Sequence, residues 1–305
     1  MGKRVLNSFA SDFEKMGKKE LLEAIAGSEG RTLMTECIGM FTPQCEDVSN
    51  AELCAAFGSD FILCNIFDVW NPDVKGLPEH NSEDTARLIK KLTGLPLAIN
   101  LEPGKLIEGS DNPWALSKGR VANAENAVRA RDMGVNMILI TGNPGIGVSN
   151  EGILNAIREI KAAVGDDLII ASGKMHAAGV IAEGADAILT MEDIDAFAEA
   201  GADIILLPAP GTVPGITVEW ARERVSRIHK LGRLSMTAIG TSQEGTDEET
   251  IKQIALMCKQ TGTDIHHIGD SGHPGIAAPR NIMSYSIAIR GIRHTYHRMA
   301  ASVRR

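Results

Sequence analysis

The sequence predicts an α/β fold, a (β/α)8 TIM barrel, and three observations support this class. An amphipathic helix, a glycine and a short apolar run recur eight times along the 305 residues. The glycines lie 28 to 40 residues apart, which is the length of one βα unit. The apolar runs show little alternation, as expected of parallel strands that are buried on both faces. Eight such units close naturally into a barrel.

The apolar runs are expected to form the eight strands, and the glycine before each run is expected to end a helix in a left-handed conformation. The helix before the last strand is expected to begin at Thr246, with Glu249 completing a capping box. The expected strands are 33–38, 61–67, 96–102, 137–142, 168–173, 203–208, 234–240 and 264–270. The glycines are Gly30, Gly58, Gly94, Gly134, Gly165, Gly201, Gly232 and Gly262.

Both ends of the chain carry helical segments that a minimal barrel does not need. An N-terminal extension, 1–30, is expected to hold one helix over about 5–26, and a long helix is expected within 279–305. The whole chain, 1–305, is expected to form one domain. We expect a homo-oligomer, because helices appended to a barrel commonly pack against a neighbouring subunit.

The composition argues against several classes of protein. The formal net charge of −8 disfavours a nucleic-acid partner, because phosphate backbones are bound by clustered Lys and Arg. The five cysteines form no CxxC pair, so we expect reduced thiols in a cytoplasmic protein. No apolar run approaches the roughly 20 residues of a membrane span, and the charged start is unlike a signal peptide. The expected partner is a small anionic metabolite.

The long loops all follow strands. They span 39–47, 68–81 and 103–121, whereas the connections that precede strands are tight glycine turns. In a parallel barrel the loops that follow strands form the face that carries catalytic residues. The sequence therefore predicts the working face at the C-terminal ends of the strands.

Two glycine-rich loops, after strands 7 and 8, are expected to bind an anion. Barrels often hold phosphate between these loops, where backbone N–H groups converge and glycine allows close approach. Ordinary turn and cap chemistry is the alternative, and Glu244 and Asp270 count against a bare phosphate site unless they point away or hold a cation. The expected anion-binding residues are Gly240, Thr241, Ser242, Gly245, Gly269, Ser271 and Gly272.

Acidic residues at strand ends form a second candidate site. Glu36, Asp68 and Asp270 are expected as Mg²⁺ ligands, since Mg²⁺ takes a few carboxylate oxygens and keeps waters. Glu102, at the end of strand 3, is a further acid–base or ligand candidate, and Asn65 and Asn100 also lie at strand ends. Taken singly, each carboxylate could equally cap a helix or pair with a buried lysine.

Lys174 and the pair His266–His267 complete the catalytic candidates. A desolvated lysine at a strand end can form a Schiff base with a carbonyl compound, although Lys174 could instead bind a substrate electrostatically. Consecutive strand residues face opposite sides, so only one of His266 and His267 can point into the barrel as a general acid or base. The other is then a core residue. No zinc-ligand spacing accompanies them.

Two blocks of sequence resemble a known family. MTAIGTSQEGTDEETIKQIAL and DIHHIGDSGHPGIAAPRNIMSYSIAIRG are similar to an uncharacterised bacterial barrel family whose members are labelled phosphoenolpyruvate phosphonomutase-like. The resemblance implies a barrel fold, a small anionic substrate and acids after the second and third strands that hold Mg²⁺. Asp68 and Glu102 match some of those positions.

The sequence therefore favours a lyase or isomerase that acts on a small phosphorylated or carboxylated metabolite, with Mg²⁺ as the expected cofactor. Two alternatives stay open. One is a metal-free sugar-phosphate aldolase or epimerase that uses Lys174 as a Schiff base or Glu102 as a proton shuttle. The other is a non-catalytic barrel that binds a small molecule.

Overall fold

The strands close into one parallel barrel in the order β1 to β8, which confirms the predicted fold class. The computed structural model describes residues 2–104, 106, 112, 114–142, 148–175 and 184–305. Every neighbouring pair of strands is parallel, including β8 with β1. The strands are Thr32–Ile38, Phe61–Asn65, Leu97–Leu101, Met137–Ile140, Ile169–Gly173, Ile204–Pro208, Leu234–Ile239 and Ile265–Ile268.

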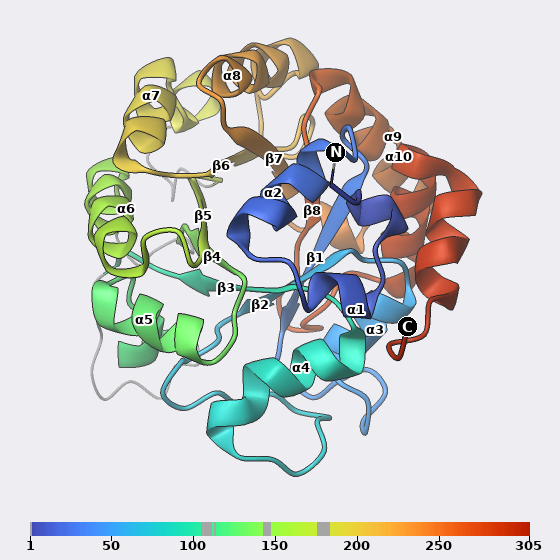
Figure 1. Ribbon diagram of the computed structural model, residues 1–305. Helices are drawn as coiled ribbons and strands as arrows, with labels where there is room; N and C mark the ends of the chain where they lie inside the picture. The colour runs from blue at the N-terminus through green and yellow to red at the C-terminus, as the bar shows by residue number, and fades with distance from the viewer. Residues whose placement is uncertain (1, 105, 107–111, 113, 143–147, 176–183) are drawn as a thin grey trace.

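Helices surround the barrel and cover one of its ends (Figure 1). The outer helices are α3 (Asn50–Ala56), α4 (Thr85–Thr93), α5 (Ala124–Asp132), α6 (Asn150–Val164), α7 (Met191–Ala200), α8 (Val218–Lys230), α9 (Glu248–Thr261) and α10 (Pro279–Ala300). Short 3-10 turns lie at η1 (Val5–Asn7), η2 (Ser82–Asp84), η3 (Lys118–Arg120), η5 (Ala185–Ile188) and η6 (Gln243–Gly245). Within the described residues, none of the helices combines the length and apolarity that crossing a bilayer requires.

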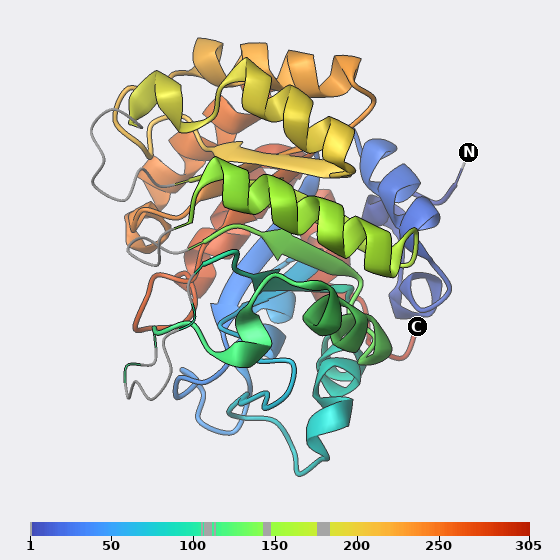
Figure 2. The ribbon, with the colours of Figure 1, turned by 90° about the vertical axis from the view of Figure 1, so that its left-hand side faces the viewer.

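The N-terminal extension differs from the single helix expected over 5–26. It forms η1, α1 (Ala10–Phe13) and α2 (Lys18–Ala26), because Phe9 and Gly17 are extended and interrupt the helical run. Figure 2 places α1 and α2 at one end of the barrel and the loops that follow the strands at the other. The extension thus closes the bottom and leaves the predicted working face open.

Two further details of the helices differ from expectation. The N-cap of α9 is Asp247, not Thr246, because the η6 turn ends at Gly245 and the Asp247 carboxylate accepts from Thr250 N at 2.9 Å. Glu249 pairs with Lys252 instead of completing a capping box. The long helix α10 is present, but it kinks at Gly291, whose φ is 75°.

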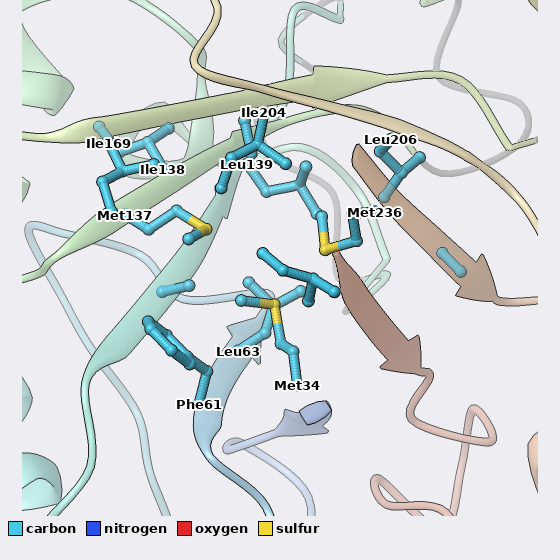
Figure 3. Packing of buried hydrophobic residues seen from close by; sticks show 14 of the residues in the cluster. Met34, Phe61, Leu63, Met137, Ile138, Leu139, Ile169, Ile204, Leu206 and Met236 are labelled. Carbon is cyan, nitrogen blue, oxygen red and sulfur yellow. The ribbon is translucent and has the colours of Figure 1, made fainter. Parts of the chain in front are cut away.

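The barrel interior below the working face is apolar. All residues of the strands are buried apart from Leu234, which is half-buried. Figure 3 shows Met34, Met137 and Met236 pointing into the interior with Leu63 and Phe61 around them. This methionine- and aliphatic-rich filling matches a chain that is only 4% aromatic. A close-packed lower barrel fixes the strand ends above it, since packed interiors deform little.

At the bottom of the barrel, one buried aspartate joins three parts of the chain. Asp60, before β2, has no exposed side-chain surface and forms ion pairs with Arg290 and Arg298 of α10. Arg298 Nε donates to Asp60 Oδ1 at 2.8 Å, and the other Arg298 nitrogens donate to the carbonyls of Ser8 and Val5. The same carboxylate accepts from Leu33 N at 2.9 Å. These contacts tie the N-terminal extension and α10 to the first two strands.

Candidate functional site

A small cavity of about 70 Å³, partly open to solvent, lies at the C-terminal ends of the strands. Its lining comes from β1, β2, β3, β4 and β8 and from the segments that follow β3, β4, β5, β7 and β8. The polar side chains that line it are those of Glu36, Asn65, Asn100, Glu102, Thr141, Glu244, His267 and Asp270. This is where barrel enzymes carry their active sites.

Strand alternation explains why these side chains share the interior. Met34 points into the barrel and Glu36 is two residues further along β1, so both face inward. The same step of two leads from Leu63 to Asn65 in β2. Both strands therefore supply an apolar side chain to the core and then a polar side chain to the cavity floor.

A bridge of two asparagines connects the carboxylates of Glu36 and Asp270. Asn100 Nδ2 donates to Glu36 Oε1 at 3.1 Å and to Asn65 Oδ1 at 3.0 Å. Asn65 Nδ2 donates in turn to Asp270 Oδ2 at 2.9 Å. The Ile66 N–H, which donates to Asn65 Oδ1, fixes the direction of the Asn65 amide, and the donation of Asn100 Nδ2 to the same oxygen then fixes the Asn100 amide.

The backbone beside this bridge is strained. Ile66 has a φ of 57°, a conformation that is rare for a β-branched residue. Its N–H donates to Asn65 Oδ1 at 2.9 Å, so the strained backbone helps to hold the amide in place. Strain of this kind gathers at functional sites, where surrounding structure maintains it.

The two consecutive histidines take different places, as alternation requires. His267 lines the cavity, and its Nε2 lies 3.2 Å from Glu36 Oε2, which is within ion-pair distance. Neither ring nitrogen of His267 makes a hydrogen bond within the described residues. His266 faces α10 instead, where Nδ1 lies 3.1 Å from the Tyr285 hydroxyl and Nε2 lies 3.0 Å from the Gly30 carbonyl. Burial lowers the pKa of His266 to about 4, so it is a neutral core residue.

Two carboxyl groups in the cavity bind protons more tightly than usual. Burial, followed by the negative charge of Glu36, raises the pKa of Asp270 to about 7. Hydrogen bonds from Asn65 and from Gly272 N oppose that rise. Burial also raises the pKa of Glu244, again with a contribution from Glu36. A carboxyl group that titrates near neutrality can exchange a proton at physiological pH.

The glycine-rich loops lie together but are already partly occupied by the protein's own carboxylates. Glu244 accepts a backbone hydrogen bond from Ser271, and Asp270 Oδ1 accepts from Gly272 N at 2.8 Å. Two N–H groups of the predicted anion site are therefore used internally. Thr241 turns away, donating to the Thr212 carbonyl at 2.8 Å, and Ser242 is exposed. Of the other predicted anion-binding residues, Gly240 and Gly269 line the cavity, and Gly245 lies next to Ser271.

Of the three predicted Mg²⁺ ligands, Glu36 and Asp270 line the cavity and Asp68 does not. Asp68 accepts from the backbone N–H groups of Trp70 and Asn71 at 2.8 and 3.0 Å and from the Ser117 hydroxyl at 2.5 Å. Its carboxylate therefore stabilises the loops that follow β2 and β3, and it does not line the cavity that contains Glu36 and Asp270. Within the described part of the chain, no group of three acidic, histidine or cysteine side chains is arranged to hold a metal ion.

The remaining catalytic candidates are both buried. Glu102 lines the cavity and forms a buried ion pair with Arg120, which follows it in the loop after β3. Lys174 is buried directly after β5, and the next residue, Met175, lines the cavity. Arg120 was not expected from the sequence, because a loop gives no periodic signal that would pair it with Glu102. Asn65, Asn100 and Glu244 were visible as strand-end or loop residues, but their amide and carboxyl contacts were not.

The raised pKa of Asp270 predicts a specific pH dependence of stability. Between about pH 4 and pH 7 the folded protein binds a proton at Asp270 that the unfolded chain releases, so folding weakens as pH rises through this range. We expect Asp270→Asn to remove this effect. From pH 5 to pH 8 the free energy of unfolding of the native protein should fall by about 2–3 kcal/mol relative to that of the variant, since each pH unit over which the two states differ by one bound proton corresponds to about 1.4 kcal/mol. Urea denaturation at both pH values measures this difference, and an unchanged difference would contradict it.

Comparison with known proteins places the chain in a family and relates its fold to several enzymes. The family model described as "Domain of unknown function (DUF7916)" matches residues 6–305. A protein of Actinobacillus pleuropneumoniae named "Putative N-acetylmannosamine-6-phosphate 2-epimerase" is 38% identical over 89 residues, which is 29% of this chain and 33% of that protein. The chain thus spans about a third of the length of this curated relative.

Solved structures show the same fold at low identity. An archaeal fructose-1,6-bisphosphate aldolase, with its catalytic lysine bound to a carbinolamine intermediate, has a TM-score of 0.57 and 16% identity over 90% of this chain and 99% of its own. A phosphonopyruvate hydrolase in complex with oxalate and Mg²⁺ has a TM-score of 0.51 and 17% identity over 83% of this chain and 81% of its own. These similarities indicate a barrel whose structural neighbours are enzymes of small-metabolite chemistry.

Proposed function

We propose that this chain, which belongs to the DUF7916 family, is a lyase or isomerase that moves a proton on a small metabolite in the barrel-mouth cavity. The observation that carries the proposal is the pairing of two acid–base groups across one rigid bridge. Asp270, whose pKa is about 7, lies at one end of the Asn65–Asn100 bridge. Glu36, beside His267, lies at the other end.

The proposed reaction uses Asp270 as a general base. Its carboxylate takes a proton from a carbon next to a carbonyl group, and the C–H electron pair moves into an enolate. The carbonyl oxygen accepts a hydrogen bond from His267, which Glu36 orients. Return of a proton to the same carbon from the other face gives epimerisation, and in an α-hydroxy carbonyl compound return to the former carbonyl carbon of the enediol gives isomerisation. In the cleavage variant the base takes the proton of a β-hydroxyl group, the carbon–carbon electron pair moves into the enolate as the aldehyde leaves, and the enolate is then protonated at carbon.

The comparisons support this class of reaction without selecting among its members. An aldolase and an epimerase, which are a lyase and an isomerase of small metabolites, both occur among the similar proteins. The phosphonopyruvate hydrolase neighbour was solved with Mg²⁺. Within the described residues of this chain, acidic, histidine and cysteine side chains form no group of three that could hold a metal ion. The proposal therefore assigns no step to Mg²⁺.

Solvent proton exchange tests the proposal without knowledge of the product. A panel of small carbonyl compounds with and without a free amine, including amino sugars, N-acetylated amino sugars, hexose phosphates and 2-keto acids, is incubated with the protein in D₂O and followed by proton NMR. We expect loss of the signal of one C–H next to the carbonyl group with the native protein and no loss with Asp270→Asn. Equal exchange with both proteins would contradict the role of Asp270, and a panel left unexchanged by the native protein would reject the proposed chemistry.

A further inference from the structure

We infer that the floor of the cavity binds a protonated amine, so that the substrate is an amine-bearing metabolite. This inference rests on the proposed function only in taking this cavity as the substrate site. It differs from the small anionic metabolite that the glycine-rich loops predicted. Two independent features carry it, the hydrogen-bond acceptors that lack donors and the charge that surrounds them.

The first feature is an excess of buried acceptor atoms. Asn100 Oδ1 and Glu244 Oε2 have no hydrogen-bond donor within the described residues, although Asn100 is 6% exposed and Glu244 is 4% exposed. The orientation of Asn100 is fixed by its two donated hydrogen bonds, so Oδ1 cannot exchange places with the amide nitrogen. A buried acceptor without a donor is destabilising, because it has lost its hydrogen bond to water. A ligand that brings donors would remove that cost.

The second feature is the charge around those acceptors. Glu36, Glu244 and Asp270 all line the cavity, and each of the latter two is affected by the charge of Glu36. The positive charge of Arg120 is already paired with Glu102. A bound phosphate or carboxylate at the floor would face these three carboxyl groups, whereas a cation would be attracted to Glu36 and would favour the deprotonated forms of Glu244 and Asp270.

An ammonium group satisfies both features at once. It carries three N–H donors and a positive charge in a compact head, and it has no acceptor. A hydroxyl group could fill one acceptor but would leave the negative charge uncompensated. An amine at the floor would also place the neighbouring carbons of the substrate beside Asp270 and His267, where the proposed proton transfer takes place.

A matched set of two-carbon probes tests the inference. Ethanolamine, ethylene glycol and glycolate are similar in size and differ in carrying a cation, no charge or an anion. Binding at pH 7 is followed by NMR of the protein labelled at methionine methyl groups, with Met175 as the reporter because it lines the cavity. We expect ethanolamine to bind at least about 10-fold more tightly than ethylene glycol, and glycolate to bind most weakly. Equal binding of the three probes, or tightest binding of glycolate, would overturn the inference.

Variants of the cavity carboxylates test whether the amine of ethanolamine binds at the cavity floor. We expect Glu244→Gln to weaken ethanolamine binding by about 10- to 100-fold and to leave ethylene glycol unchanged. Glu249→Gln is the matched control, because Glu249 is exposed on α9 and pairs with Lys252. Glu36→Gln is a second test if Glu244→Gln does not fold, since it removes a different charge from the same cavity. Ethanolamine affinity that survives both cavity variants would place the amine elsewhere and contradict the inference.

The inference and the proposed function fail in different ways. Tight ethanolamine binding without exchange in any carbonyl compound would keep the amine site and reject the proton-transfer function. Exchange that requires Asp270 but is confined to compounds without an amine would keep the function and reject the amine site.

Discussion

Asp270→Asn is expected to lower kcat/KM by about 10²- to 10⁴-fold, the range that a positioned acid–base group contributes. The amide is nearly the same size as the carboxyl group and can still accept from Asn65 or from Gly272 N, but it cannot take a proton. In the native protein, kcat/KM should rise as pH increases through about 7, because Asp270 must be deprotonated to act as a base. The measurement is the pH–rate profile of the compound that exchanges in D₂O.

The control for this variant is Asp73→Asn, which changes an exposed aspartate that pairs with Lys75 in the loop after β2. Its kcat/KM and pH profile should equal those of the native protein. A native profile that falls as pH increases through 7 would assign Asp270 as a general acid. Full activity of Asp270→Asn would remove Asp270 from the mechanism.

Asp60→Asn is expected to lower the free energy of unfolding by about 3–5 kcal/mol, because it leaves two buried arginines without their carboxylate. The side chains of Arg290 and Arg298 are 1% and 5% exposed, so water does not replace the lost partner. A loss of this size is a large fraction of the total stability of a typical domain. Chemical denaturation at pH 7 measures it.

The comparison variant is Asp195→Asn, which breaks an aspartate–arginine pair of the same type on the surface. Asp195 pairs with Arg227 through two hydrogen bonds of 2.7 Å, and both side chains are about 40% exposed. Exposed pairs contribute roughly 0–1 kcal/mol, so this variant should be nearly as stable as the native protein. Equal losses in the free energy of unfolding for the two variants would show that burial does not increase the contribution of the Asp60 ion pairs with Arg290 and Arg298 to stability.

The fold could be predicted because its signals are periodic and local. Each of the eight predicted glycines has a positive φ, from 53° at Gly165 to 114° at Gly201. Only glycine takes this conformation freely, so most of these glycines identify a helix end independently of packing. The exception is Gly30, because α2 ends at Ala26 with Gly27 as its C-cap, and Gly165 ends α6 with a ψ of −117° that lies outside the left-handed helical region. The N-terminal extension was predicted less well, because Phe9 and Gly17 interrupt a stretch whose apolar spacing is still helical.

The site could be predicted where it lies on strands and could not where it lies on loops. Alternation in β1 places Glu36 inward, and alternation in β8 requires His266 and His267 to separate. The direction of Asp68 and Glu244 depends on loop backbones that have no period. Asp68 turns to Ser117, and Glu244 turns into the space expected for an anion. The carboxylate-lined floor is thus a product of tertiary structure.

The most direct test of the account is a ¹³C NMR titration of the aspartate carboxyl groups, with Asp270→Asn identifying the signal of Asp270. The account predicts that this carboxyl group titrates near pH 7 in the folded protein. Titration near the ordinary aspartate value of about 4 would mean that the cavity holds no carboxyl group poised for proton exchange at neutral pH. That result would contradict the proposed acid–base site.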